Sequence, residues 1–263
     1  MPGVRSRVRV RPGRGGLGLG VATLYMSVIV LIPLAAVAAK AFGQGLGALW
    51  SSITSSVALT ALGVTLASSL LVAAIGAVMG TVVAWVLVRD RFPGKRFVNA
   101  LIDLPFALPT IVAGLTLIAL YGPQSPVGIH LAYARAGVLL ALLFVTLPFV
   151  VRAVQPVLIE LDPEAEEAAS SLGASSFTTF RRIVLPALRP AIISGTALAF
   201  ARAIGEYGAV VLLAGKVQIA SLVIYNDIES GTPEGAASLS IMLLAVSLLV
   251  LVLLRRIGGR GAT

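Results

Sequence analysis

Long apolar runs, separated by short polar or basic segments, extend along most of the chain. We identify six runs, over about Leu17–Phe42, Val57–Val88, Val98–Tyr121, Ala136–Val151, Ala191–Ala214 and Ala236–Leu254. About 20 apolar residues are needed for a helix to cross the ~30 Å hydrocarbon core of a bilayer. The second run exceeds one crossing, which indicates tilt or an interfacial start, and the fourth is short. The pattern predicts an all-α, polytopic transmembrane bundle of about six spans.

The composition agrees with a membrane protein. Hydrophobic residues make up 58% of the 263 residues and charged residues 12%, whereas about a quarter of a soluble domain is charged. Helices are expected because backbone groups in lipid must be satisfied within the segment, and the alternating segments of a barrel are missing. The chain has no cysteine, and no Asp, Glu or Cys cluster surrounds its one histidine, His130. We therefore expect no metal site.

The basic residues predict the orientation of the chain in the membrane. With six crossings and both termini in the cytoplasm, sixteen of the 20 Lys and Arg residues share the cytoplasmic face. These are Arg5, Arg7, Arg9, Arg11, Arg14, Arg89, Arg91, Lys95, Arg96, Arg152, Arg181, Arg182, Arg189, Arg255, Arg256 and Arg260. We expect a basic cytoplasmic tail over residues 1–16, a membrane domain over 17–254 and a basic cytoplasmic tail over 255–263. The first span is expected to be retained rather than cleaved as a signal peptide, and the net charge of +9 reflects topology rather than nucleic-acid binding.

One connector, between the fourth and fifth runs, is amphipathic. Asp162 followed by Pro163 is typical of a helix N-terminus, and the glutamates that follow favour the positive end of the helix dipole. Gly173 can adopt the positive φ that ends a helix, and Ser175 or Ser176 can cap a second helix. The connector is thus expected to form a helical hairpin over about residues 162–186 that Pro186 separates from the fifth span. Leu172 and Phe177 are expected to be exposed near its turn. A protein partner fits its acidic first half better than an anionic lipid surface does.

The hairpin sequence resembles the "EAA" signature of bacterial ATP-binding-cassette (ABC) importer permeases. The matching pattern is Glu-Ala-Ala, three residues, glycine, nine residues and Ile-Val-Leu-Pro, from Glu167 to Pro186. The resemblance implies a cytoplasmic coupling helix that docks on an ATP-binding subunit and transmits its motion to the pore. The residues to which it assigns this role, with the neighbouring packing candidates, are Glu167, Ala168, Ala169, Leu172, Gly173, Phe177, Ile183, Leu185 and Pro186.

Three further stretches resemble sulfate/thiosulfate permeases of the T type. They are LIDLPFALPTIVAGLTLIALYGPQSPVG at 101–128, LPFVVRAVQPVLIELDPEAEEAASSLGAS at 147–175 and ALAFARAIGEYGAVVLLAG at 197–215. Molybdate/tungstate permeases, which share the third stretch, are the alternative. The segment from Lys216 to Tyr225 is shorter than the usual outer loop of the family. The resemblance implies a bacterial-type inner membrane location, a second permease subunit in a heterodimeric pore, two ATP-binding subunits and an extracytoplasmic sulfate-binding protein.

Three charged residues lie in or near the spans. Arg202 and Glu206 are four residues apart, so on a helix they share a face and can form an ion pair. A role of Arg202 in the anion path stays open beside that pairing, because guanidinium suits an oxyanion. Asp103 is expected to cap a helix or to pair with loop arginines.

Prolines and glycines near these charges predict bends and close packing. Pro105 and Pro109 are expected to kink the third span, and Gly205 and Gly208 to allow close helix packing or a bend. For most of the small residues in these spans, helix packing is the expected role.

The chain lacks the Gly-x-x-x-x-Gly-Lys-Ser/Thr phosphate loop, so no catalytic site and no cofactor are expected in it. ATP and magnesium would be bound by the partner subunits. Two rival classes remain, a secondary anion transporter and a membrane-embedded enzyme. The first predicts inverted repeats and leaves the hairpin without a purpose, and the second requires a nucleophile–base pair or metal motif that a single loop histidine does not supply.

Overall fold

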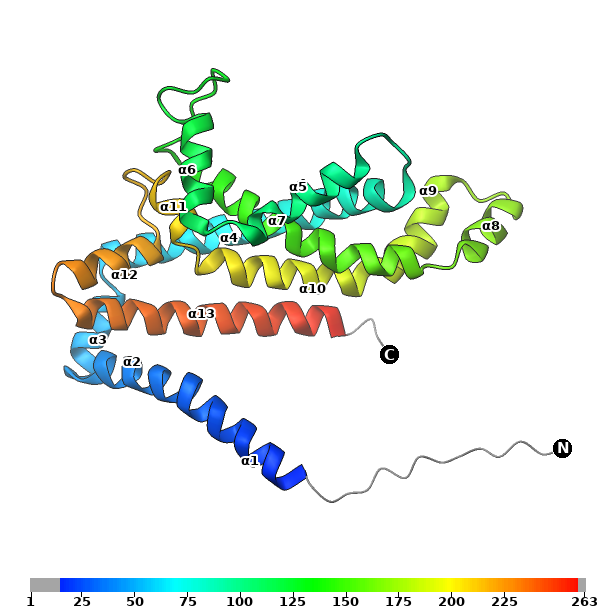
Figure 1. Cartoon of the computed structure of the whole chain (residues 1–263). Coiled ribbons are helices and arrows are strands. Elements are labelled where there is room, and N and C mark those ends of the chain that lie inside the picture. Colours follow the sequence, from blue (N-terminus) through cyan, green and yellow to red (C-terminus); the bar gives the residue numbers. More distant parts are fainter. Residues whose placement is uncertain (1–14, 260–263) are drawn as a thin grey trace.

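The computed structural model describes residues 15–259, and this part of the chain is built from helices joined by turns and short loops (Figure 1). The first half contains α1 (Gly15–Met26), the π-helix η1 (Ser27–Leu31), α2 (Ile32–Phe42), α3 (Gly45–Ile53), α4 (Ser56–Arg89), α5 (Lys95–Ala107) and α6 (Thr110–Tyr121). The second half contains α7 (Arg135–Glu160), α8 (Pro163–Ser171), α9 (Ser176–Thr179), the π-helix η2 (Phe180–Val184), α10 (Leu185–Ile204), α11 (Gly208–Val211), α12 (Ala220–Glu229) and α13 (Pro233–Gly259).

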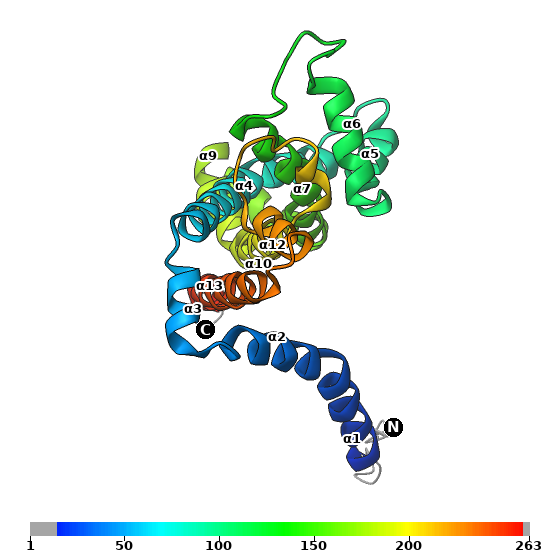
Figure 2. The same cartoon turned by 90° about the vertical axis from the view of Figure 1, so that its left-hand side faces the viewer.

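Three long helices, α4, α7 and α10, pack side by side and form the centre of the molecule (Figures 1 and 2). Glycines allow the close approach. A Cβ on Gly80 of α4 would lie 2.7 Å from the Cβ of Val150 on α7, and a Cβ on Gly195 of α10 would lie 2.9 Å from the Cβ of Ala153. Small residues at such contacts let helices pack closely where lipid supplies no hydrophobic driving force between them.

The remaining long helices lie outside this centre. α13 packs against α10, α12 and α2, while α1 and η1 continue α2 away from the bundle (Figures 1 and 2). In the first span, no residue of the most apolar 18-residue stretch is buried. In a bilayer such a surface faces lipid or a second membrane subunit, because apolar side chains can pack against either.

The structure confirms an all-helical membrane fold. Five helical segments are long and apolar enough to span a bilayer, and a bent pair raises the number to six. Three spans end several residues away from the predicted positions. α7 continues nine residues beyond the predicted end of the fourth span, to Glu160, and α10 ends at Ile204 rather than at Ala214. Arg152 therefore lies within α7 rather than in the connector, and α13 runs on to Gly259.

The third span is broken rather than kinked. The helix direction bends by 119° between α5 and α6. Pro105 lies inside α5 without ending it, whereas Pro109 is the N-cap of α6. Leu108 is extended, with ψ 136°, because the ring of the following proline disfavours the helical conformation there. The bend at the prolines was predicted, but the two halves form separate helices rather than one kinked helix. The break lies at Leu108–Pro109.

The ends of the helices fall into two groups in Figure 1. The turn between α4 and α5, the α8–α9 region, and the last turns of α13 lie toward one end of the bundle, and α3, α12 and the α12–α13 turn toward the other. The tail arginines Arg5, Arg7, Arg9, Arg11, Arg14 and Arg260 lie outside the described residues. The described part of the basic set lies mostly toward the first end, as the predicted topology requires.

Candidate functional site

The connector between α7 and α10 forms the predicted hairpin (residues 162–186). The Asp162 carboxylate accepts a 2.9 Å hydrogen bond from the Glu164 N–H and so caps α8. The Ser175 hydroxyl accepts one from the Thr178 N–H at 3.3 Å and caps α9. These local contacts follow from the short polar side chains at the two N-caps.

A tight turn joins the two arms of the hairpin. Gly173 has φ +81°, the left-handed conformation that the sequence predicted for it. The Gly173 N–H donates to the Ser170 carbonyl at 2.9 Å, and the Ala174 N–H donates to the Ala169 carbonyl at 3.0 Å. This pair of bonds is a Schellman motif, which satisfies the carbonyls that the end of α8 would leave free.

The tip of the hairpin presents two large apolar side chains, as predicted. Leu172 is 89% exposed and Phe177 is 70% exposed. Burying one such side chain contributes about 1.5–3 kcal/mol, so the two together form a small but strong contact patch. The other predicted coupling residues surround this patch or lead away from it. Glu167, Ala168, Leu185 and Pro186 are exposed, and Ala169 and Ile183 are half-buried.

Two side chains on the last turns of α4 hold both arms of the hairpin. Arg89 forms an ion pair with Glu166 on α8. Trp85, one helical turn earlier, packs edge-to-face on Phe180 of η2 with ring centroids 5.6 Å apart. The Arg89 guanidinium also lies 5.5 Å from the centroid of the Trp85 ring. The hairpin is therefore fastened to the central bundle through α4.

The second arm continues into the fifth span without a break. Residues Ser176–Ile204 form one helical segment of 29 residues, through the wide π-turn η2 and into α10. Pro186 lies in the first turn of α10, directly after the π-turn, so the regular α-helix is interrupted just before this proline but the two segments are not separated. A wide turn at this point adapts the helix to the missing N–H of proline.

At the far end of this helix, Arg202 and Glu206 form an ion pair with an Nη1–Oε2 distance of 2.5 Å. The Glu206 side chain is 1% exposed and that of Arg202 is 34% exposed. The second carboxylate oxygen of Glu206 accepts a 2.8 Å hydrogen bond from the Ala209 N–H at the start of α11. Glu206 lies beyond the end of α10, so the pair joins the helix end to the turn that follows it.

The glycines beside this pair differ in what surrounds them. A Cβ on Gly208 would lie 2.3 Å from the Thr110 hydroxyl oxygen, so this glycine lets α11 approach the start of α6. No atom lies within 4 Å of the position that a Cβ would take on Gly205. Gly205 is the C-cap of α10, so of the two roles expected of these glycines, close packing and a bend, Gly205 is placed at the bend.

The first half of the broken span is tied to α7 by a charged network. Arg152 binds Asp103 with both carboxylate oxygens, at 2.6 Å for the Nε–Oδ1 contact and 2.6 Å for the Nη2–Oδ2 contact. Arg152 also donates to the side-chain and main-chain oxygens of Asn99, both at 2.9 Å. Asp103 thus pairs with an arginine, as expected, but with one on the fourth span. Among residues 15–259, no group of three or more His, Asp or Glu side chains is placed to hold a metal ion.

A comparison with known families decides the identity of this arrangement. Residues 76–257 match the family described as "Binding-protein-dependent transport system inner membrane component". The chain belongs to this family of inner-membrane permeases. The permease also resembles curated sulfate permeases over most of its length. It is 44% identical over 242 residues to "Sulfate transport system permease protein CysT" of Synechocystis sp., covering 88% of this chain and 85% of the relative. It is 41% identical over 239 residues to the protein of the same name from Escherichia coli K12, covering 87% and 86%.

Solved structures share the fold of the permease. A bacterial ABC transporter involved in the import of the acidic polysaccharide alginate has a chain that superimposes with a TM-score of 0.77 at 16% identity, covering 94% of this chain and 96% of the other. A chain of the MetNI methionine ABC transporter, in an inward-facing conformation, superimposes with a TM-score of 0.59 at 20% identity, covering 77% and 93%. The permease is thus a multi-span inner-membrane protein with the ABC importer permease fold.

Two anchoring residues of the permease were not identified from the sequence. Arg89 was assigned only to membrane topology, and Trp85 was not singled out. Their spacing of four residues at the polar end of a long apolar helix is the one available signal, since it places both on one face. Their partners, Glu166 and Phe180, lie far along the chain, so the pairing follows from the fold rather than from local sequence.

Proposed function

We propose that this permease is one of two membrane subunits of an ATP-driven importer for sulfate. The substrate assignment is supported by one observation. The chain is 41–44% identical, over 86–95% of its length, to proteins named as sulfate transport system permeases. Thiosulfate, another divalent sulfur oxyanion, is a second substrate in this proposal. The family description adds an extracytoplasmic binding protein as the source of the anion.

The energetics of the substrate require active transport. Moving a dianion into a cytoplasm that is negative by 100 mV costs about 4.6 kcal/mol, at about 2.3 kcal/mol per charge. The chain has no phosphate-binding loop of its own. We therefore assign ATP and magnesium binding, and hydrolysis, to two partner subunits beneath the membrane domain.

The hairpin (residues 162–186) is the proposed contact with an ATP-binding subunit. Leu172 and Phe177 supply the apolar patch, while Ala169 and Gly173 permit close approach at the turn. Motion of the partner is transmitted along two paths: through the Arg89–Glu166 pair to α4, and through the continuous helix from Ser176 to α10. Both helices belong to the bundle centre, so movement at the tip changes how the central helices pack.

Arg202 and Glu206 are proposed to hold the pore structure together. The Glu206 carboxylate receives both the Arg202 guanidinium and the Ala209 N–H. An arginine whose charge is balanced in this way attracts an anion weakly, which favours the structural role over a binding site in the anion path.

The orientation follows from the basic residues and the hairpin. We place the hairpin end, with both termini, in the cytoplasm, and the end with α3 and α12 on the outer face, where the binding protein docks. The exposed apolar first span leaves room for lipid and for the second permease subunit, which we propose is a different chain.

Copurification and uptake test this function together. A tagged permease, expressed with its genomic neighbours, should retain an ATP-binding subunit and restore sulfate uptake to cells that lack their own importer. Molybdate should compete weakly. If molybdate is carried and sulfate is not, the substrate assignment is wrong while the importer assignment stands. If no ATP-binding subunit is retained and uptake is unaffected by ATP depletion, a secondary transporter replaces the importer.

A further inference from the structure

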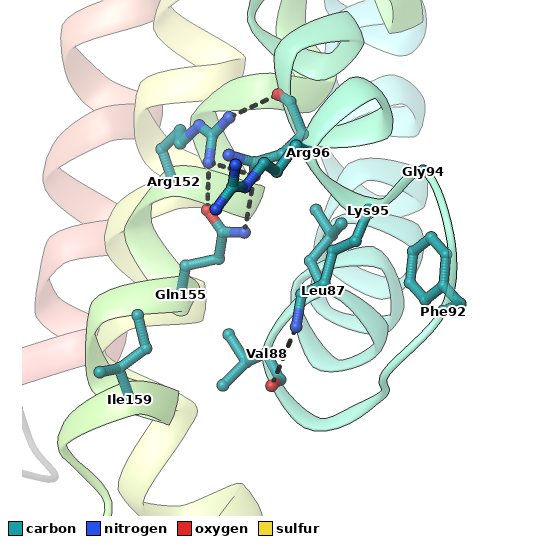
Figure 3. Close-up of a pocket in the computed structure, with 10 residues that line it drawn as sticks. Leu87, Val88, Phe92, Gly94, Lys95, Arg96, Arg152, Gln155 and Ile159 are labelled. Carbon is teal, nitrogen blue, oxygen red and sulfur yellow. Dashed lines mark hydrogen bonds between the residues drawn. The ribbon is translucent and has the colours of Figure 1, made fainter.

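A cavity of about 810 Å³ lies between the end of α4, the start of α5 and the second half of α7 (Figure 3). The α4–α5 turn lies toward the hairpin end of the bundle (Figure 1). Lys95, Arg96 and Arg152 line it together with the side-chain amides of Asn99 and Gln155. No carboxylate is among its lining residues. Three cations from two helices thus converge on one hollow, where positive potential is concentrated by the low-dielectric walls.

Only one of these three cations is paired with a carboxylate in the described part of the chain. Arg152 is bound by Asp103, Asn99 and Gln155. The Lys95 ammonium donates to the main-chain carbonyls of Asp90 at 3.0 Å and Val88 at 3.5 Å, at the C-terminal end of α4, and pairs with no carboxylate among residues 15–259. Arg96 makes no hydrogen bond or ion pair with any residue from 15 to 259 and is exposed. After the Asp103–Arg152 pair is counted, two positive charges remain at the cavity.

The start of α5 adds to this positive field. Gly94, which also lines the cavity, is the N-cap of α5 and offers no side chain to the helix N–H groups. The first N–H groups of a helix have no partner within it, and its N-terminus carries a partial positive charge of roughly half a unit. Phosphate and sulfate groups bind at such N-termini when cationic side chains are also present.

The other walls of the cavity are apolar. Leu87, Val88, Phe92 and Ile159 line it beside the basic group. A site with cations at one side and apolar walls at the other suits a phosphate joined to a glycerol and acyl chains, as in an anionic phospholipid of the inner leaflet. A free tetrahedral anion meets the same cations and the same helix N-terminus.

We propose that this cavity binds a tetrahedral oxyanion, either the phosphate of an anionic phospholipid or a free sulfate or phosphate ion of the cytoplasm. The ligand contacts Lys95 and Arg96 at the start of α5. Arg152 forms part of the facing wall, but its guanidinium N–H groups already bind Asp103, Asn99 and Gln155, so it offers the ligand no free donor. The site is separate from the Arg202–Glu206 pair and does not depend on the proposed transport function, since binding is measured without transport.

Arg96→Gln is the test variant, because it removes a charge from a side chain that holds nothing else in place. Arg91→Gln is the matched control. It removes an equal charge from an exposed arginine four residues away from the start of α5 that does not line the cavity. Arg96→Lys is a second variant, which keeps the charge and should keep most of the binding.

Binding is measured on the full-length permease in a neutral detergent. Native mass spectrometry reports bound phosphatidylglycerol against phosphatidylcholine, and equilibrium dialysis reports radiolabelled sulfate and inorganic phosphate. We expect Arg96→Gln to weaken binding of the oxyanion about tenfold, the value of one charge-assisted hydrogen bond, and Arg91→Gln to leave it unchanged.

The pattern of results identifies the source of the oxyanion. Selective retention of phosphatidylglycerol that is lost in Arg96→Gln shows a lipid site, and retention of the labelled ions with the same dependence shows a free-ion site. If neither class binds, or if Arg91→Gln and Arg96→Gln weaken binding equally, the cavity is not an oxyanion site.

Discussion

A substitution of Gly173 tests whether the geometry of the hairpin turn matters for coupling. Gly173 has φ +81°, and no atom lies within 4 Å of the position that a Cβ would take. A Cβ at this position therefore meets no neighbour among residues 15–259, so within the permease its effect comes from backbone conformation. The series Gly173→Asn, Gly173→Ala and Gly173→Val increases that conformational cost stepwise, because asparagine tolerates the left-handed region best and a β-branched residue least.

The size of the effect follows from the cost of the left-handed conformation. An ordinary L-residue pays about 1–2 kcal/mol there, which changes the ratio of the native turn to relaxed turns by about 5–30-fold. The Leu172–Phe177 patch depends on this turn for its shape. Sulfate uptake per ATP hydrolysed should therefore fall in the order glycine, asparagine, alanine, valine.

The assay is uptake of labelled sulfate and release of phosphate in the same proteoliposomes. Gly231→Ala is the matched control, because Gly231 has φ +77°, also has no atom within 4 Å, and lies in the turn between α12 and α13 at the opposite end. It carries the same strain without touching the hairpin, so its coupling ratio should stay at the wild-type value. Equal effects of Gly173→Ala and Gly231→Ala, or full coupling in Gly173→Val, would refute a coupling role for this turn.

Three further substitutions test other contacts of the permease. Glu166→Gln removes the ion pair between α8 and α4 and should lower sulfate uptake per ATP hydrolysed. The free energy of unfolding, measured by thermal unfolding, should fall by at most about 1 kcal/mol, because the pair is partly exposed. Gly80→Ala places a methyl group 2.7 Å from a valine of α7 and should destabilise the purified protein by about 1–3 kcal/mol, whereas Gly63→Ala, with no atom within 4 Å, should not destabilise it. Arg202→Gln leaves Glu206 buried without its cation and should lower the free energy of unfolding by about 3 kcal/mol. The double variant with Glu206→Gln should regain part of this loss.

Much of the hairpin could be predicted from sequence because its determinants are local. The Asp162 cap, the Ser175 cap and the Gly173 turn each depend on residues within a few positions of one another. The same holds for the number of spans, since an apolar run long enough for the bilayer needs no tertiary partner to be recognised.

The parts that sequence did not predict depend on distant contacts. Arg152 reaches Asp103 and Asn99 across 49 and 53 positions of the chain, and Arg89 reaches Glu166 across 77. The end of α10 is another example. An apolar run continues past Ile204, but Glu206 turns the chain by accepting the Ala209 N–H and pairing with Arg202. Hydropathy does not report such a turn.

ATP-dependent uptake of radiolabelled sulfate tests most directly whether the permease is part of a driven importer. Proteoliposomes would contain the copurified complex, with the sulfate-loaded binding protein outside and ATP inside, and parallel vesicles would lack either ATP or the ATP-binding subunits. We predict sulfate accumulation against its gradient only when ATP, the ATP-binding subunits and the binding protein are all present. Equal accumulation in vesicles without the ATP-binding subunits would contradict the importer function.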